Sequence, residues 1–129
     1  MPLNHINAIS LFVEDLPAAR AFYLDVFGVP VAYEDDNCTV VKFENVLINL
    51  LQIAHAPEIV APGAVAPSTA GSRFQMSIWV ADVQAVCERL KQRGIPINGP
   101  LDRPWGLRTI NFTDPAGHSW EVGQQLTPA

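Results

Sequence analysis

Histidine, cysteine, serine and carboxylate side chains carry most enzyme chemistry, and their spacing in this chain is not that of a common active site. The three histidines are His5, His55 and His118, and none is spaced with another histidine or a carboxylate as a metal-binding pair would be. Each is interpreted as a lone surface residue. The chain also lacks a serine nucleophile elbow, a phosphate-binding glycine loop and a cysteine with a matching histidine. These absences favour binding over independent catalysis.

Aromatic side chains offer broad faces on which a flat or cationic ligand can stack. Trp105 lies in a loop containing proline and glycine (DRPWGLR), where a large aromatic side chain is exposed unless it closes over something. The sequence leaves ligand binding and packing open for it. The other aromatic residues considered are Phe43, Phe74, Trp79, Phe112 and Trp120, several of which must belong to the core.

Arg108 follows the Trp105 loop and begins the next expected strand. Its guanidinium can pair with a ligand carboxylate, or it can lock the loop by pairing with Asp102 or Asp114. Both roles stay open from the sequence, and Arg108 is kept as a candidate ligand-binding residue.

An internal repeat supplies the elements that must position these residues. The stretch ISLFVEDL at residues 9–16 matches MSIWVADV at residues 76–83 position by position. The second-last residue of each stretch is an aspartate, Asp15 or Asp82, which we predict to cap the helix that follows, at residues 17–27 or 84–93. Gly28 and Gly94 then supply the left-handed turn that ends each helix.

Runs typical of strands follow each predicted helix, so that each copy is predicted to be a β-α-β-β-β module of the α+β class. The expected strands cover residues 31–33, 39–43 and 46–51 in the first copy, and 95–97, 108–112 and 118–123 in the second. The first module then covers residues 5–55 and the second residues 73–125, within a single domain of residues 1–129. Residues 56–72 are rich in Pro, Ala and Gly without periodicity and are predicted to be a linker, which could also serve as a flap.

Composition narrows the possible partners and location. The net charge of −5 disfavours nucleic acid and anionic membranes as partners. No apolar run approaches the roughly 20 residues of a membrane span, and no signal peptide is recognisable, so a cytoplasmic location is expected. Cys38 and Cys87 are then expected to be reduced, with Cys87 in the core of a helix.

Two motifs of the second half, together with the repeat, point to a known family. These are PWGLR at residues 104–108 and DPAGHSWE at residues 114–121, and the first helix contains Phe22 and Tyr23. The chain resembles the vicinal oxygen chelate superfamily, which contains glyoxalase I, extradiol dioxygenases, fosfomycin-resistance enzymes and bleomycin-resistance proteins. Nearly the whole chain is covered, and the second half is similar to the bleomycin-resistance and antibiotic-binding branch. The resemblance implies two modules forming a curved mixed sheet, a cup, in a homodimer.

The resemblance also implies where a divalent metal would bind in metal-dependent members, namely on the first and last strands of each copy. Those positions fall on Ala8, Asn49, Gln75 and Glu121. Alanine has no donor and neutral amides are poor ligands, so we expect neither a metal nor another cofactor. In a member without metal, Glu121 would attract a cation or, if desolvated, act as a base.

The expected function is therefore metal-independent binding or sequestration of a small organic molecule such as an antibiotic, with no catalytic residue assigned. The candidate ligand-binding residues are Asn49, Gln75, Trp105, Arg108 and Glu121. The alternative is a divalent-metal-dependent lyase, dioxygenase or thiol transferase of the same superfamily.

Overall fold

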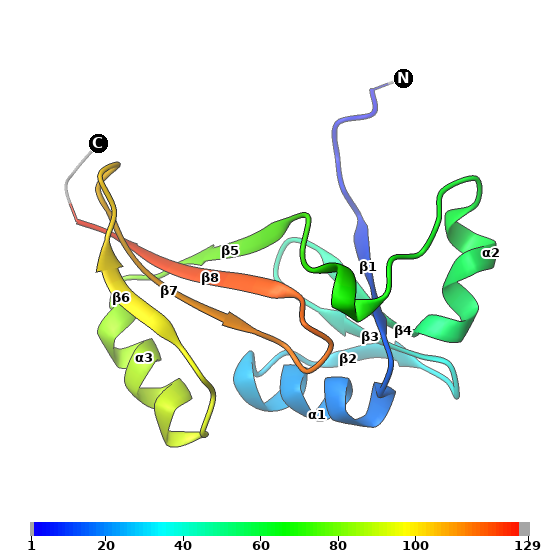
Figure 1. Ribbon diagram of the computed structural model, residues 1–129, viewed down its shortest axis with the longest axis horizontal. Helices are drawn as coiled ribbons and strands as arrows, with labels where there is room; N and C mark the ends of the chain where they lie inside the picture. Colours follow the sequence, from blue (N-terminus) through cyan, green and yellow to red (C-terminus); the bar gives the residue numbers. More distant parts are fainter. Residues whose placement is uncertain (1, 127–129) are drawn as a thin grey trace. The chain divides into compact units, whose positions relative to one another are not determined.

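The computed structural model describes residues 2–126, and the chain divides into two compact units, Met1–Ala70 and Gly71–Ala129. The main elements of unit 1 are β1 (Ala8–Val13), α1 (Leu16–Val26), β2 (Val31–Glu34), β3 (Cys38–Lys42) and β4 (Leu47–Gln52). Those of unit 2 are β5 (Gln75–Trp79), α3 (Val83–Gln92), β6 (Asn98–Asp102), β7 (Leu107–Thr113) and β8 (Ser119–Gln125) (Figure 1). Both units are β-α-β-β-β, which confirms the predicted repeat.

Each unit forms one four-stranded mixed sheet. The strand orders are β1-β4-β3-β2 in unit 1 and β5-β8-β7-β6 in unit 2. The first strand of each unit pairs in parallel with the last, and all other pairs are antiparallel. A parallel pair needs a crossover connection, and the helix and the two middle strands provide it.

The predicted helix caps are confirmed in both units. A side-chain oxygen of Asp15 accepts a hydrogen bond from the amide of Ala18 at 3.1 Å, and Asp82 accepts one from Ala85 at 3.1 Å. Gly28 follows α1 with a φ of 63°, a conformation that glycine adopts at no steric cost.

The core of unit 2 lies on one side of its sheet. Helix α3 contacts β6, β7 and β8 (Figure 1). Its residues Val83, Cys87 and Leu90 are buried, as expected for Cys87. Alternate strand residues are buried with them, namely Ile110, Phe112, Trp120 and Val122. Two of the six aromatic residues singled out in the sequence therefore belong to the core.

One expected strand is wrong, and the predicted linker contains short helical segments that the sequence did not indicate. Residues 95–97 are not a strand, because the amide of Ile95 still bonds the carbonyl of Leu90 and closes the end of α3, so that β6 begins at Asn98. The predicted linker contains the short helix α2 (Ala56–Val60) and a 3-10 turn at Ser68–Ala70, with another 3-10 turn, Ile53–His55, before it. Among residues 2–126, no helix is long and apolar enough to cross a membrane.

Candidate functional site

The side of the unit 2 sheet opposite its core carries mostly polar side chains. Side chains of directly paired residues share a face, and successive residues alternate between faces. The register therefore places three rows of residues on this side, and each row contains one directly paired residue from each of β5, β8 and β7. We call it the polar face, and it consists of Gln75, Ser77 and Trp79 on β5, Ser119, Glu121 and Gly123 on β8, and Thr109, Asn111 and Thr113 on β7.

Glu121 lies in the middle row of the polar face, between Ser77 on β5 and Asn111 on β7. The Ser77 hydroxyl donates a hydrogen bond to Oε1 of Glu121 at 3.0 Å. Glu121 is half-buried, and within residues 2–126 no cation lies within ion-pair distance of it. A neutral hydroxyl leaves the carboxylate charge uncompensated, so Glu121 can attract a ligand cation.

Arg103 brings a positive charge to the same face, although it belongs to the turn between β6 and β7. Its Nε donates to Oγ1 of Thr109 at 2.9 Å, and its Nη2 donates to Oδ1 of Asn111 at 3.3 Å. Both acceptors are neutral, and in the described part of the chain the guanidinium has no ion pair. The remaining N–H groups can therefore bind an anion.

Trp79 supplies an apolar surface at one end of the polar face. The residue is 71% exposed, and its Cδ1 atom lies 3.5 Å from the point where Gly123 would carry a Cβ. Because Gly123 has no side chain, the indole can lie close to the backbone of β8. An exposed indole beside a carboxylate suits a flat or cationic molecule.

The predicted site residues are only partly brought together. Gln75 and Glu121 share the polar face, and Nε2 of Gln75 donates to Oγ of Ser119 at 3.2 Å. Asn49 lies on β4 of unit 1, where its Nδ2 donates to Oγ of Ser10 at 3.3 Å. Trp105 is 67% exposed in the turn that also holds Arg103.

Arg108 points to the other side of β7 from Thr109 and so lies off the polar face. Its Nε lies 2.7 Å from Oδ1 of Asp102, and its Nη2 lies 3.2 Å from Oδ2. The hydrogen bond with this guanidinium lowers the pKa of Asp102 below its usual value. Of the two roles left open by the sequence, locking of the hairpin is the one that this geometry supports.

Sequence reasoning missed four residues of the site, namely Ser77, Arg103, Thr109 and Asn111. The alternation of β7 was a usable signal, because the polar residues Thr109 and Asn111 alternate with the apolar residues Ile110 and Phe112. Arg103 gave no such signal, because it reaches the face from a turn.

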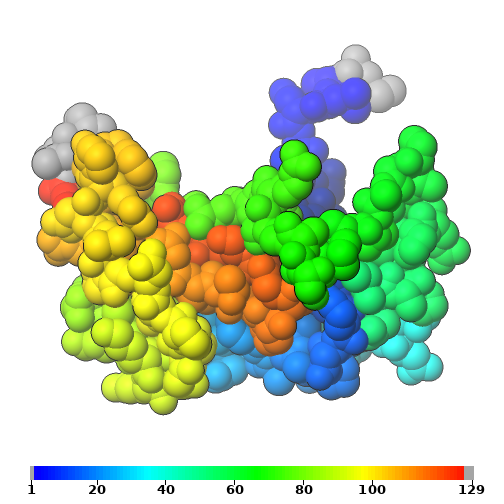
Figure 2. Space-filling view, in the orientation of Figure 1, coloured from blue at the N-terminus to red at the C-terminus, as the bar shows by residue number. Residues whose placement is uncertain are grey.

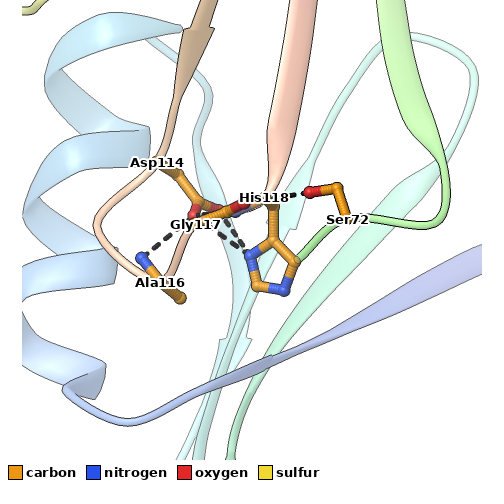
Figure 3. A network of polar contacts seen from close by, with 5 residues as sticks. All are labelled: Ser72, Asp114, Ala116, Gly117 and His118. Atoms are coloured by element: carbon orange, nitrogen blue, oxygen red, sulfur yellow. Dashed lines mark hydrogen bonds and ion pairs between the residues drawn. The ribbon is translucent and has the colours of Figure 1, made fainter. Parts of the chain in front are cut away.

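His118 is not the lone surface residue that the sequence suggested. Its Nδ1 lies 2.8 Å from Oδ2 of Asp114, a carboxylate that is fully buried (Figure 3). Oδ1 of Asp114 also accepts from the amides of Ala116 and His118, at 3.0 and 2.9 Å. Ser72 braces the same turn by donating to the carbonyl of Gly117 at 3.1 Å. This network fixes the start of β8, the strand that carries Glu121.

The donor set does not fit a divalent metal. Of the four positions implied by the family resemblance, Ala8 has no donor atom, and Asn49 and Gln75 bear neutral amides that bond to serines. Only Glu121 supplies a carboxylate. Across residues 2–126, no group of three or more His, Cys, Asp or Glu side chains could hold a metal ion.

Comparison with known proteins agrees with this fold. Residues 3–122 match the Glyoxalase/Bleomycin resistance protein/Dioxygenase superfamily. The chain belongs to this superfamily. Its relative YraH of Bacillus subtilis (strain 168), an uncharacterized protein, is 29% identical over 123 residues, which are 92% of this chain and 96% of YraH.

Two solved structures show the range of proteins that share the fold. The lactoylglutathione lyase of Agrobacterium tumefaciens is 27% identical with a TM-score of 0.76, and 95% of each chain is covered. TnmS3, an antibiotic-binding protein of Streptomyces sp. CB03234, is 24% identical with a TM-score of 0.74, covering 97% of this chain and 98% of that one. Because an enzyme and a binding protein share this fold, the fold alone does not determine the function of the chain, which must be argued from its side chains.

We predict that Asp114→Ala lowers the free energy of unfolding by about 3 kcal/mol, because it leaves the part-buried amides of Ala116 and His118 and the His118 ring without their acceptor. Chemical denaturation measures the change. Asp102→Ala is the matched control, since this exposed carboxylate pairs with Arg108 at the surface and its loss should change stability far less. Equal effects of the two substitutions would contradict the bracing role of Asp114.

Proposed function

We propose that this protein binds a small organic molecule on the polar face of unit 2 without a metal. The observation that carries the proposal is Glu121, a half-buried carboxylate whose hydrogen-bond partner among the described residues is the neutral hydroxyl of Ser77, one row from the exposed indole of Trp79. A ligand cation gains a charge-assisted hydrogen bond from Glu121, and an attached ring gains stacking on Trp79.

An antibiotic is one class of molecule that would suit this face. Membership of a superfamily that includes bleomycin resistance proteins supports it, and TnmS3 is an antibiotic-binding protein with the same fold. In this proposal the protein sequesters its ligand and carries out no reaction on it. Gln75 lies in the row beside Glu121 and provides a further amide for polar contact, and exposed Trp105 provides a second aromatic side chain on unit 2.

A thermal-shift screen against aromatic amines and glycopeptide antibiotics tests the proposal. We expect at least one compound to raise the melting temperature, since a ligand at 100 times its Kd adds about 2.7 kcal/mol to the free energy of unfolding. Glu121→Gln should weaken that compound at least about tenfold, the effect of losing roughly 1.4 kcal/mol of binding free energy. It should leave the unliganded melting temperature nearly unchanged, because a glutamine oxygen still accepts from Ser77.

Glu88→Gln is the matched control, because it makes the same chemical change on α3, an element on the core side of the sheet. Its affinity for the compound should equal that of the unaltered protein. A screen without any hit would contradict the proposal, and so would a hit whose affinity Glu121→Gln and Glu88→Gln change equally.

A metal-dependent lyase is the second candidate, favoured by the 27% identity with the Agrobacterium lactoylglutathione lyase. It requires donors that the four family positions do not supply. We expect protein purified without chelator to hold far less than one equivalent of Zn, Ni, Fe or Mn by elemental analysis. One equivalent of any of these metals would overturn the metal-independent proposal in favour of the lyase.

We also propose a homodimer. The segment before β1 carries Leu3 and Ile6, which are 96% and 69% exposed, and it projects from the rest of unit 1 (Figure 2). Apolar side chains on an extended arm gain stability when a second copy covers them. Light scattering at micromolar concentration should give twice the chain mass, and Leu3→Asp with Ile6→Asp should shift it toward one chain. A monomer in the unaltered protein would contradict the proposal.

A further inference from the structure

The polar face of unit 2 carries an unpaired cation as well as an unpaired anion. Among the described residues, the guanidinium of Arg103 bonds only the neutral oxygens of Thr109 and Asn111, and the carboxylate of Glu121 accepts from the hydroxyl of Ser77. We propose that Arg103 anchors a carboxylate and Glu121 an ammonium group of the same ligand, so that the ligand class is an aromatic zwitterion such as an amino acid or a short peptide-like molecule. This inference rests on the proposed function.

Arg103 and Glu121 are both neighbours of Asn111, and their charged groups form no ion pair with each other. Asn111 accepts from Arg103 and is the direct cross-strand partner of Glu121, so one strand spacing of about 5 Å separates the residues that hold the two groups. No ion pair within 4.0 Å joins Arg103 to Glu121. A ligand with an amine and a carboxylate a few bonds apart can satisfy both charges at once.

The chemistry of Arg103 favours a planar anion. A guanidinium has five N–H donors, of which Nε and one on Nη2 are engaged here, and its fork geometry matches a carboxylate. The bonds to Thr109 and Asn111 fix the guanidinium against the sheet before a ligand arrives. Less side-chain freedom is then lost on binding.

The overall charge favours a zwitterion over a simple anion. At a net charge of −5 the protein repels anions, and Glu121 adds a local repulsion on the same face. An ammonium group on the ligand removes that local repulsion. Trp79, one row from Glu121, accounts for the aromatic part of the ligand.

Three indole compounds test the contributions of the ammonium and the carboxylate separately. They are tryptamine, which carries only the ammonium, indole-3-propionate, which carries only the carboxylate, and tryptophan, which carries both. Titrations followed by amide NMR of the full chain should show the strongest affinity for tryptophan and shifts at Ser77, Glu121 and Arg103. Arg103→Gln should weaken tryptophan and indole-3-propionate at least about tenfold and leave tryptamine unchanged, and Glu121→Gln should weaken tryptophan and tryptamine instead.

Arg108→Gln is the matched control for Arg103→Gln. It removes a guanidinium from the same hairpin and changes the net charge equally, but Arg108 lies on the other side of β7 and is paired with Asp102. Its affinities for the three compounds should match those of the unaltered protein. Arg103→Lys keeps the charge and loses the fork, so it should bind indole-3-propionate with intermediate affinity, and it replaces Arg103→Gln if that variant does not fold.

The outcomes distinguish this inference from the proposed function. One outcome is that tryptamine binds through Glu121, while Arg103→Gln and Arg108→Gln have the same affinities for tryptophan and for indole-3-propionate. In that case the inference is wrong and the proposed function stands. If Arg103→Gln changes only the melting temperature, Arg103 serves to hold the turn and the inference is again wrong. If none of the three compounds moves any signal of the polar face and the antibiotic screen is also empty, both fail.

Discussion

Parallel pairing of the first and last strands is the constraint on which each unit depends. Two parallel neighbours cannot be joined by a tight turn, so a helix and two further strands separate them in the sequence. In the sheet, these two further strands lie on the far side of the last strand from the first. In unit 2 this makes β8 a central strand with β5 on one side and β7 on the other. Glu121, in the middle of β8, therefore has a cross-strand neighbour on both sides, Ser77 and Asn111.

The same pairing places a polar residue of the last strand opposite a serine of the first strand in both units, and this polar residue differs between the two copies. Asn49 stands opposite Ser10 in unit 1 as Glu121 stands opposite Ser77 in unit 2, and each bonds its serine. Asn49 is neutral, and its Oδ1 atom is buried with no partner among the described residues. The copies thus share a scaffold, while at this position only unit 2 carries a charge.

Much of the fold could be predicted from the sequence because it follows from local rules. The repeat of strand, aspartate and helix fixed the two caps, and Gly28 and Gly94 marked the helix ends. The start of β6 was placed too early, since the backbone of Ile95 is held by the last turn of α3. Residues 56–72 contain few polar or periodic positions, so a helix as short as α2 leaves no pattern to recognise.

The site was less predictable than the fold because its contacts join residues from different elements. Alternation along a strand predicts which face Glu121 takes, but it does not show that a turn residue such as Arg103 folds back over β7. His118 was misjudged for a related reason: the carboxylate that it contacts belongs to a turn whose buried state depends on packing around it. The local sequence pattern predicts which face of a strand a residue occupies. Contacts between residues distant in the sequence determine which charged side chains lie together on that face.

The separation of Arg103 and Glu121 is itself an argument for binding. Two opposite charges near each other on a sheet would stabilise the fold most by pairing directly or by giving way to neutral or apolar residues. Here each charge is held by neutral hydroxyl or amide groups, and Asn111 lies beside both. Half-buried charges that are held in place but not neutralised contribute little to the stability of the fold. Their electrostatic attraction is therefore available to a ligand that carries an ammonium and a carboxylate.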